Sequence, residues 1–364
     1  MAGKLRILLT VLLLGAVSGC DSVAFYVQAV SGQVSLLWHR QSIERLLQDP
    51  ALDPALRQKL QIIQQATDYA EQKLGLSAEG SYDSYVELQR RHLVWNVFAA
   101  PEFSTQPVSW CFPIAGCVDY RGYFSETAAL RYAGDLRTQG LDVYVGGVDA
   151  YSTLGWFNDP VPSTIIQRPD HQLVALIFHE LAHQKLYLPG DTAFNESFAS
   201  FVSQAGLRDW LDQQGQPELY LQSMQDSLEQ QRFIDFVLDY RERFAMVYAS
   251  DISVDAMRMQ KQQLQNAMRR SWQQLAEEHS AAGDRYQGWF QAPLNNAQLA
   301  TVGSYFTWVP AFAALFEQHA GDYDSFYEVV ASLAALTPEA RLKRLSALMP
   351  AEADQDARPG HGSL

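Results

Sequence analysis

Residues 176–201 read LIFHELAHQKLYLPGDTAFNESFASF and decide how the chain folds. The apolar run up to Leu188 predicts a buried helix, and Pro189–Gly190 ends it and lets the chain turn back into a second helix. His179 and His183 are four residues apart, so both imidazoles leave the same face of the first helix. The stretch therefore predicts two helices that run against each other.

The residue types on the first helix match a metal site. His-Glu-x-x-His supplies two imidazole nitrogens for zinc and sets Glu180 beside the position left open for a reactant. Zinc lowers the pKa of water towards neutrality, and a neighbouring carboxylate can take the proton. The alternative is a core helix with hydrogen-bonded histidines, although burying these groups without partners would be costly. We expect His179 and His183 to bind one zinc ion, with Glu180 as the general base.

A third ligand is expected on the second helix. Glu196 lies among Phe194, Phe198 and Phe201, where an unpaired carboxylate would be expensive to bury. Asp191 is the rival, but it stands where a helix N-cap is wanted. We expect Glu196 to complete the zinc site.

Other side chains are candidates for supporting roles. Asn195 and Ser200 could orient the ligands, or could be ordinary helix-surface residues. His171 reads as a helix-start residue rather than a ligand. An oxyanion-stabilising group is also needed, and Tyr151 and Tyr305 are the candidates, each with a structural role as the alternative.

Composition narrows the class of protein. The chain has 364 residues, 48% of them hydrophobic, which is ample for a large core. Its formal net charge is −14, and it lacks the clustered Lys and Arg that nucleic-acid binding needs. We therefore expect no nucleic-acid partner.

Residues 1–19 read as a signal peptide, with Lys4 and Arg6 before a short apolar stretch. The stretch ends in VSGC at residues 17–20, which resembles the lipobox of bacterial lipoproteins. An ordinary secretory signal is the alternative. We expect Cys20 to be lipidated and to hold the protein on the periplasmic side of a membrane; Asp21 resembles an inner-membrane retention residue.

If Cys20 carries lipid, two cysteines remain, Cys111 and Cys117. An even remainder in an exported chain implies a disulfide, with two free buried thiols as the alternative.

The rest of the chain reads as α+β. Helices are expected over 23–49 and 53–76, strands over Leu88–Phe98 and in VSWCF, YRGYF and LDVYVGG, and a helix over 125–140. Beyond Asp170 the pattern is helical, with a long hairpin over 217–280 and a helix over 295–321 kinked near Pro310. We expect an enzyme unit over 20–348, divided into helices plus sheet (20–169) and a mainly helical part with the site (170–348), and a disordered tail over 349–364.

Several stretches together resemble the bacterial "putative aminopeptidase" lipoproteins. They are VSGC, CFPIAGCVDYRGYF, GGVDAYSTLGWFNDP, HELAHQKLYLPGDTAFNESFASFV and NNAQLATVGSYFTW. NESFA is also similar to the Asn-Glu-x-x-Ala of gluzincin metallopeptidases, although the spacing from the histidines is shorter than usual. The resemblance implies a zincin-like fold, in which a small mixed sheet packs on the His-Glu-x-x-His helix. It also implies zinc bound by His179, His183 and Glu196, and Glu180 as the base.

The leading reading is a lipid-anchored zinc aminopeptidase that hydrolyses peptides. An endopeptidase acting on envelope proteins and a non-catalytic zinc lipoprotein are the alternatives, and the presence of Glu180 argues against the last. An aminopeptidase needs an acidic group for the substrate amine, and Asp119, Glu126 and Asp149 all remain candidates. Substrate could add a strand at YRGYF or at YVGGVDAYS, where the glycine pair at 146–147 would allow close approach or simply form a hairpin.

Overall fold

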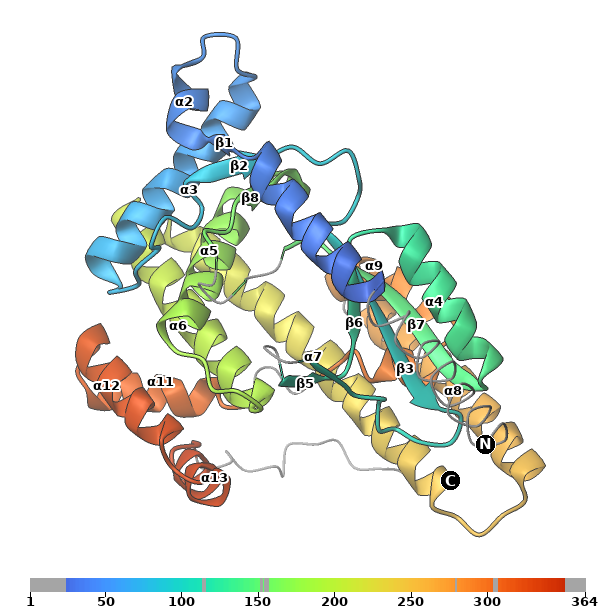
Figure 1. The fold of residues 1–364 in the computed structure, drawn as a ribbon. Helices are drawn as coiled ribbons and strands as arrows, with labels where there is room; N and C mark the ends of the chain where they lie inside the picture. The colour runs from blue at the N-terminus through green and yellow to red at the C-terminus, as the bar shows by residue number, and fades with distance from the viewer. Residues whose placement is uncertain are drawn as a thin grey trace, which may run out of the picture.

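The computed structural model describes residues 24–112, 116–150, 153, 157–278, 280–303 and 307–350. It is an α+β fold, as expected, in which helices predominate and the described strands form small sheets (Figure 1). No helix in this part of the chain is both long and apolar enough to cross a membrane. The signal peptide, Cys20, Tyr151, Tyr305 and the tail from residue 351 lie outside the described residues.

The N-terminal segment is more broken than the sequence suggested. A helix over 24–39 is followed by β1 (Gln41–Ser42), α2 (Ile43–Gln48) and α3 (Pro54–Lys73). Asp53 caps α3 by accepting a hydrogen bond from the Leu56 N–H at 3.0 Å, and Pro54 opens the helix. β1 pairs antiparallel with β2 (Ser84–Val86), which pairs parallel with β8 (Val161–Pro162), so this small sheet is mixed.

A second sheet is antiparallel, in the order β6 (Arg121–Tyr123), β3 (Val94–Pro101), β7 (Leu141–Val148). Helix α4 (Glu126–Thr138) covers one face, where its buried alanines join Val97 and Val143 in one core. The strand expected over Leu88–Phe98 begins only at Val94. Alternating burial starts there, whereas Leu88 and Leu93 pack with Leu36 in a separate apolar cluster.

Cys111 and Cys117 form the expected disulfide, and it joins β4 (Trp110–Phe112) to β5 (Gly116–Val118) in a short hairpin.

Helices α5 (Asp170–Lys185) and α6 (Thr192–Gln213) form the centre of the main core. They are the two helices that residues 176–201 predicted. Tyr85 and Val161 of the mixed sheet share this core with them, together with α3 and the C-terminal helices. The approach of α6 to its neighbours is close: a Cβ on Gly206 would lie 2.6 Å from Leu74 Cδ1 and 3.1 Å from Phe178 Cδ2.

The C-terminal half is helical. The expected hairpin over 217–280 is present as α7 (Pro217–Tyr248) and α8 (Val254–Glu278), and α9 (Ser280–Gln291) completes an aromatic core around Phe233, Trp272 and Phe290. The expectation of one helix kinked at Pro310 was wrong. The described residues form α10 (Asn296–Leu299) and α11 (Val309–Gln318), with Pro310 in the first turn of α11, where its missing N–H breaks no hydrogen bond.

Two further helices, α12 (Tyr323–Ala334) and α13 (Pro338–Ser346), follow α11 beside α6 (Figure 1). Arg341 of α13 is 5% exposed and ties this end of the chain to the turn before α6. Its guanidinium lies 2.9 Å from Asp191 Oδ2 and also donates to the carbonyl of Leu336.

We predict that Arg341→Met lowers the free energy of unfolding by about 2–4 kcal/mol, because it leaves a partly buried carboxylate and a carbonyl without their donor. Urea unfolding measures the loss. Arg344→Met in the same helix removes an exposed guanidinium and should change stability by less than about 0.5 kcal/mol. Equal effects of the two substitutions would contradict the prediction.

Candidate metal centre

The two histidines are held by a helix whose opposite face is buried. Leu173, Ile177, Phe178 and Leu181 of α5 are fully buried in the main core. Helical spacing then directs His179 and His183 together to one side. His183 has 8% of its side chain exposed and His179 has 22%, so the pair lies at the edge of the core with one side open.

The turn between α5 and α6 is fixed by side chains of α6 itself. Gly190 has a φ of +85°, a conformation that glycine adopts without strain. The Asn195 amide donates to the Leu188 carbonyl and accepts from the Leu188 N–H, both at 2.8 Å. Asn195 is 2% exposed, so it is a structural clamp on this turn and sets where the following residue, Glu196, lies.

Asp191, the alternative candidate for the third ligand, already makes other contacts. It caps α6 by accepting from the Phe194 N–H at 3.1 Å, and it pairs with Arg341 at 2.9 Å. Glu196, one turn into α6, faces the histidines instead.

Among the described residues, His179, His183 and Glu196 form a group that could hold a metal ion, with their ligand atoms all within 4.8 Å of one another. The two Nε2 atoms are 3.1 Å apart. Glu196 Oε2 lies 3.3 Å from His179 Nε2, and Oε1 lies 3.7 Å from His183 Nε2.

These separations fit zinc. Tetrahedral zinc with ligands at about 2.0–2.2 Å separates neighbouring ligand atoms by roughly 3.3–3.6 Å. The observed 3.1, 3.3 and 3.7 Å bracket that range. Two nitrogens and one carboxylate also leave a fourth position for a reactant, which is the ligand set of a catalytic rather than a structural zinc site.

The electrostatics of the group favour a cation. Burial by itself would raise the pKa of Glu196, but hydrogen bonds and charge from the two imidazoles lower it to about 2. Burial opposes protonation of His179, yet Glu196 and Glu180 together raise its pKa. The group therefore attracts positive charge to the space between its ligand atoms, and a proton and a metal ion compete for that space.

Glu180 is partly buried on the same helix, next to His179. Burial raises the pKa of Tyr82 well above its usual value, and the charges of Glu180 and then Asp159 raise it further. Tyr82 is 6% exposed and has a φ of 65°, a conformation uncommon for a residue other than glycine. It is therefore a fixed neighbour on the Glu180 side of the site, which sequence reasoning missed because nothing local to Tyr82 marks it.

Two other tyrosines lie on the Glu196 side. Burial, then the charges of Tyr187 and Glu196, raise the pKa of Tyr120, and burial and Glu196 raise that of Tyr187. Both residues remain over one-third exposed. Tyr187 follows His183 by four residues, a spacing that could have identified it, and the ring centroids are 6.5 Å apart. Tyr120 reaches the site only through folding.

The candidates for binding a substrate amine are not equivalent. Asp149 is already paired, with His92 at 2.6 Å and Arg168 at 3.7 Å. Asp119 accepts from the Ser109 hydroxyl at 2.6 Å, beside Tyr120. Glu126 lies in the first turn of α4, the helix that covers the antiparallel sheet.

His171 and Ser200, the other two residues considered from the sequence, are both buried. His171 lies in the first turn of α5 and is 7% exposed, and Ser200 is buried on α6. Strands β6 and β7 are the two edges of their sheet, as a strand-adding substrate would require. Gly147, however, accommodates His92, because a Cβ there would lie 2.2 Å from the imidazole.

We predict that Asn195→Ala weakens zinc binding by about 10–100-fold, because the clamp that sets the position of Glu196 is lost. A chelator competition titration measures the affinity. Ser203→Ala is the matched control: it removes the 2.7 Å hydrogen bond from α6 to the Ala175 carbonyl of α5, two turns beyond Glu196. That variant should lose about 1 kcal/mol of stability and keep its zinc affinity. Unchanged zinc affinity in Asn195→Ala would show that the clamp does not position the ligand.

Comparison with known proteins gives one match. No curated protein sequence and no solved structure matches the chain significantly. The model of the family described as "Putative aminopeptidase" matches residues 24–345, which covers most of the chain and includes His179, His183, Glu196 and all three described sheets. The chain therefore belongs to the "Putative aminopeptidase" family.

Proposed function

We propose that this protein is a zinc-dependent metallopeptidase of gluzincin type that removes residues from the N-terminus of peptides. The observation that carries the proposal is the set of three ligand-atom separations around His179, His183 and Glu196, which suit one tetrahedral zinc ion. Membership of the family supports peptidase activity. The lipobox-like VSGC supports attachment to the bacterial envelope through lipid on Cys20, facing the periplasm.

Zinc, when bound, supplies a Lewis acid that polarises a carbonyl and makes hydroxide accessible at neutral pH. The protein's own groups divide the remaining work. Glu180 accepts a proton from the water that attacks the scissile carbonyl and then passes it to the leaving amine. Tyr120, with its raised pKa, stays protonated and donates a hydrogen bond to the oxygen on which negative charge develops.

Substitution of a ligand and substitution of the base should have different effects on zinc content and turnover. Glu180→Gln keeps the shape of the side chain and leaves His179, His183 and Glu196 in place, so we expect one zinc per chain and a turnover lower by about 10²–10⁴-fold. His183→Ala removes a ligand, so zinc content and turnover should fall together.

Metal analysis and hydrolysis of defined peptides, on both variants side by side, make the test. Stepwise loss of N-terminal residues is the expected product pattern, and internal cuts would indicate an endopeptidase instead. A Glu180→Gln protein that cleaves peptides as fast as the parent would rule out this mechanism.

We predict that Tyr120→Phe lowers kcat by about 10²–10³-fold with zinc content unchanged, because one donor to the developing oxyanion is lost. Tyr144→Phe is the matched control. Both rings lie near Phe98, at 5.7 and 6.4 Å between centroids, but only Tyr120 feels the charge of Glu196. Kinetics of the two variants decide the role: equal turnover would remove Tyr120 from the mechanism and direct the search to Tyr187, Tyr151 and Tyr305.

A further inference from the structure

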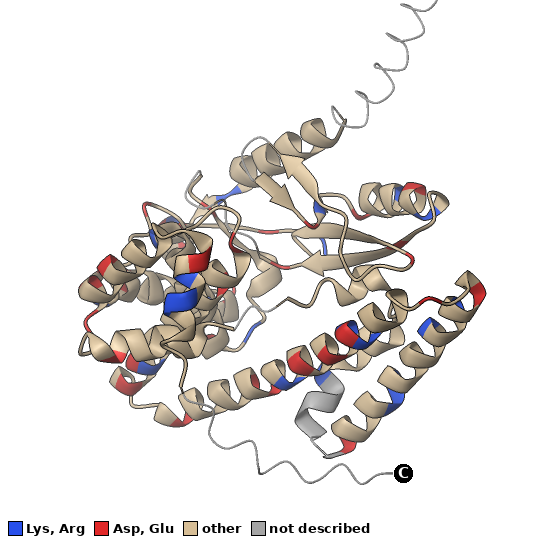
Figure 2. Cartoon of the chain, turned by 90° about the horizontal axis from the view of Figure 1, so that it is seen from below, with Lys and Arg blue, Asp and Glu red and all other residues tan. Residues whose placement is uncertain are grey.

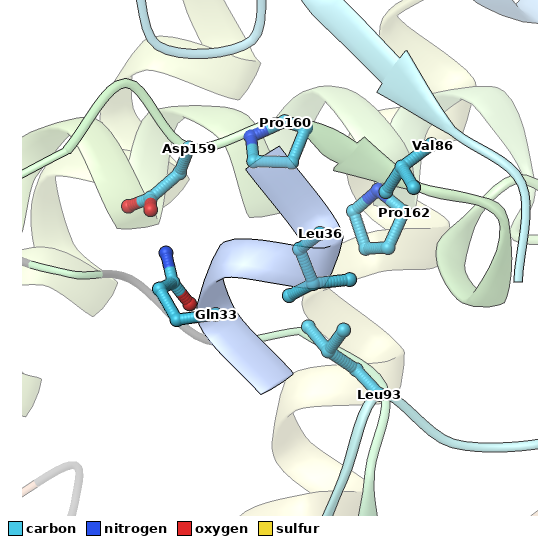
Figure 3. A pocket seen from close by; sticks show the side chains of 7 residues that line it. All are labelled: Gln33, Leu36, Val86, Leu93, Asp159, Pro160 and Pro162. Atoms are coloured by element: carbon cyan, nitrogen blue, oxygen red, sulfur yellow. The ribbon is translucent and has the colours of Figure 1, made fainter. Parts of the chain in front are cut away.

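The helix over residues 24–39 is attached to the rest of the protein by one face. Phe25 and Leu36 are buried, at 9% and 5% exposure. The Gln28 side chain donates to the Gly122 carbonyl and accepts from the Phe124 N–H. Figure 3 shows Leu36 pointing between Val86, Leu93 and Pro162 in a pocket under this helix. Phe25, Gln28 and Leu36 are separated by three and then by eight residues, which places all three on a single helical face.

The opposite face is apolar too. Val27, Val30, Val34 and Trp38 are 61%, 62%, 54% and 82% exposed. Their spacing of three or four residues gathers them in one stripe along the helix, turned away from the buried face. A surface helix of a soluble protein normally carries polar residues there, and a continuous exposed apolar stripe marks an interaction site.

The charges around the stripe suit an anionic surface. The chain has 41 acidic residues, yet none lies between Asp21 and Glu44. In Figure 2 the helix is free of charged residues up to Arg40, whereas the long helices on the opposite side of that view carry many. Trp38, at the end of the stripe, is a residue type enriched where membranes meet water.

The position of this helix along the chain indicates that the apolar stripe contacts lipid. Ala24, at the start of the described helix, is four residues after Cys20. Four residues span at most about 14 Å when fully extended. A lipid on Cys20 would therefore hold the start of this helix, at Ala24, within that distance of the bilayer surface.

We propose that the helix over residues 24–39 lies on the membrane, with the stripe of Val27, Val30, Val34 and Trp38 inserted among the lipid headgroups and upper acyl chains. The stripe then forms a second contact beside the lipid anchor, and two contacts fix the orientation of the protein where one flexible tether would not. This inference rests on the envelope attachment and is independent of peptidase activity.

The experiment places a fluorescent probe on the stripe of the full-length protein. Val34→Cys is labelled with a nitrobenzoxadiazole thiol reagent and reconstituted in vesicles of phosphatidylethanolamine and phosphatidylglycerol, some containing nitroxide-labelled lipid. Leu342→Cys on α13 is the matched control, since it is also 54% exposed but lies away from this helix in Figure 1. The parent chain, treated with the same reagent, reports any labelling of Cys20.

We expect the probe at position 34 to shift to the blue in vesicles and to be quenched by nitroxide lipid, and the probe at 342 to show neither change. The Glu180→Gln form of the labelled protein should behave identically, which separates this result from the peptidase mechanism. Three outcomes would overturn the proposal: a chain that does not associate with vesicles, a position-34 probe as open to water as that at 342, or a shielded probe without lipid quenching. Disulfide-linked dimers of unlabelled Val34→Cys protein, formed under a mild thiol oxidant, would then identify a second copy as the occupant.

Discussion

The contact between α5 and α6 is the constraint on which the site depends. A pair of imidazoles and a carboxylate stand at the edge of an apolar core, where polar groups are costly unless they are satisfied. His179 and His183 are adjacent through their spacing on α5, and Glu196 comes to within 3.3–3.7 Å of them because α6 packs closely against α5. Gly206 allows that approach, because a larger side chain there would meet Leu74 and Phe178. The cation that we propose at this site would offset what the burial of the three ligand atoms costs.

This arrangement explains why α6 is buried on nearly all sides. Phe194, Phe198 and Phe201 pack against aromatic residues of α11 and α12, so the side of α6 away from the site is closed by the C-terminal helices. Arg341 then joins α13 to the N-terminus of α6 through Asp191. The helical C-terminal half thus supports the position of one glutamate, and a ligand helix supported from both sides holds its geometry better than a loop would.

Features that depend on neighbouring residues could be predicted from the sequence, whereas features that depend on residues far apart along the chain were missed. The helix pair, and the grouping of His179 and His183 with Glu196, follow from local spacing, a turn signal and the cost of a lone carboxylate among phenylalanines. The start of the strand at Val94 was mispredicted because tertiary packing of Leu88 and Leu93 overrides their local pattern. The break before α11 was mispredicted because Pro310 opens a new helix there instead of kinking a longer one. Tyr82 and Tyr120 could not be found, since they approach Glu180 and Glu196 across about a hundred and about seventy-five residues of intervening sequence.

The charge distribution bears on how the protein would face a membrane. A body with a formal net charge of −14 is repelled by an anionic bilayer, and this repulsion acts at any orientation that turns acidic residues towards the lipid. The stretch between Asp21 and Glu44 has no acidic residue, and its helix carries the apolar stripe. At the membrane surface that we propose, electrostatic repulsion and apolar burial would select the same orientation, with the helix over 24–39 on the lipid. Gln28 hydrogen-bonds to Gly122 in β6 and to Phe124 just after it. The antiparallel sheet would therefore have a fixed orientation relative to the membrane.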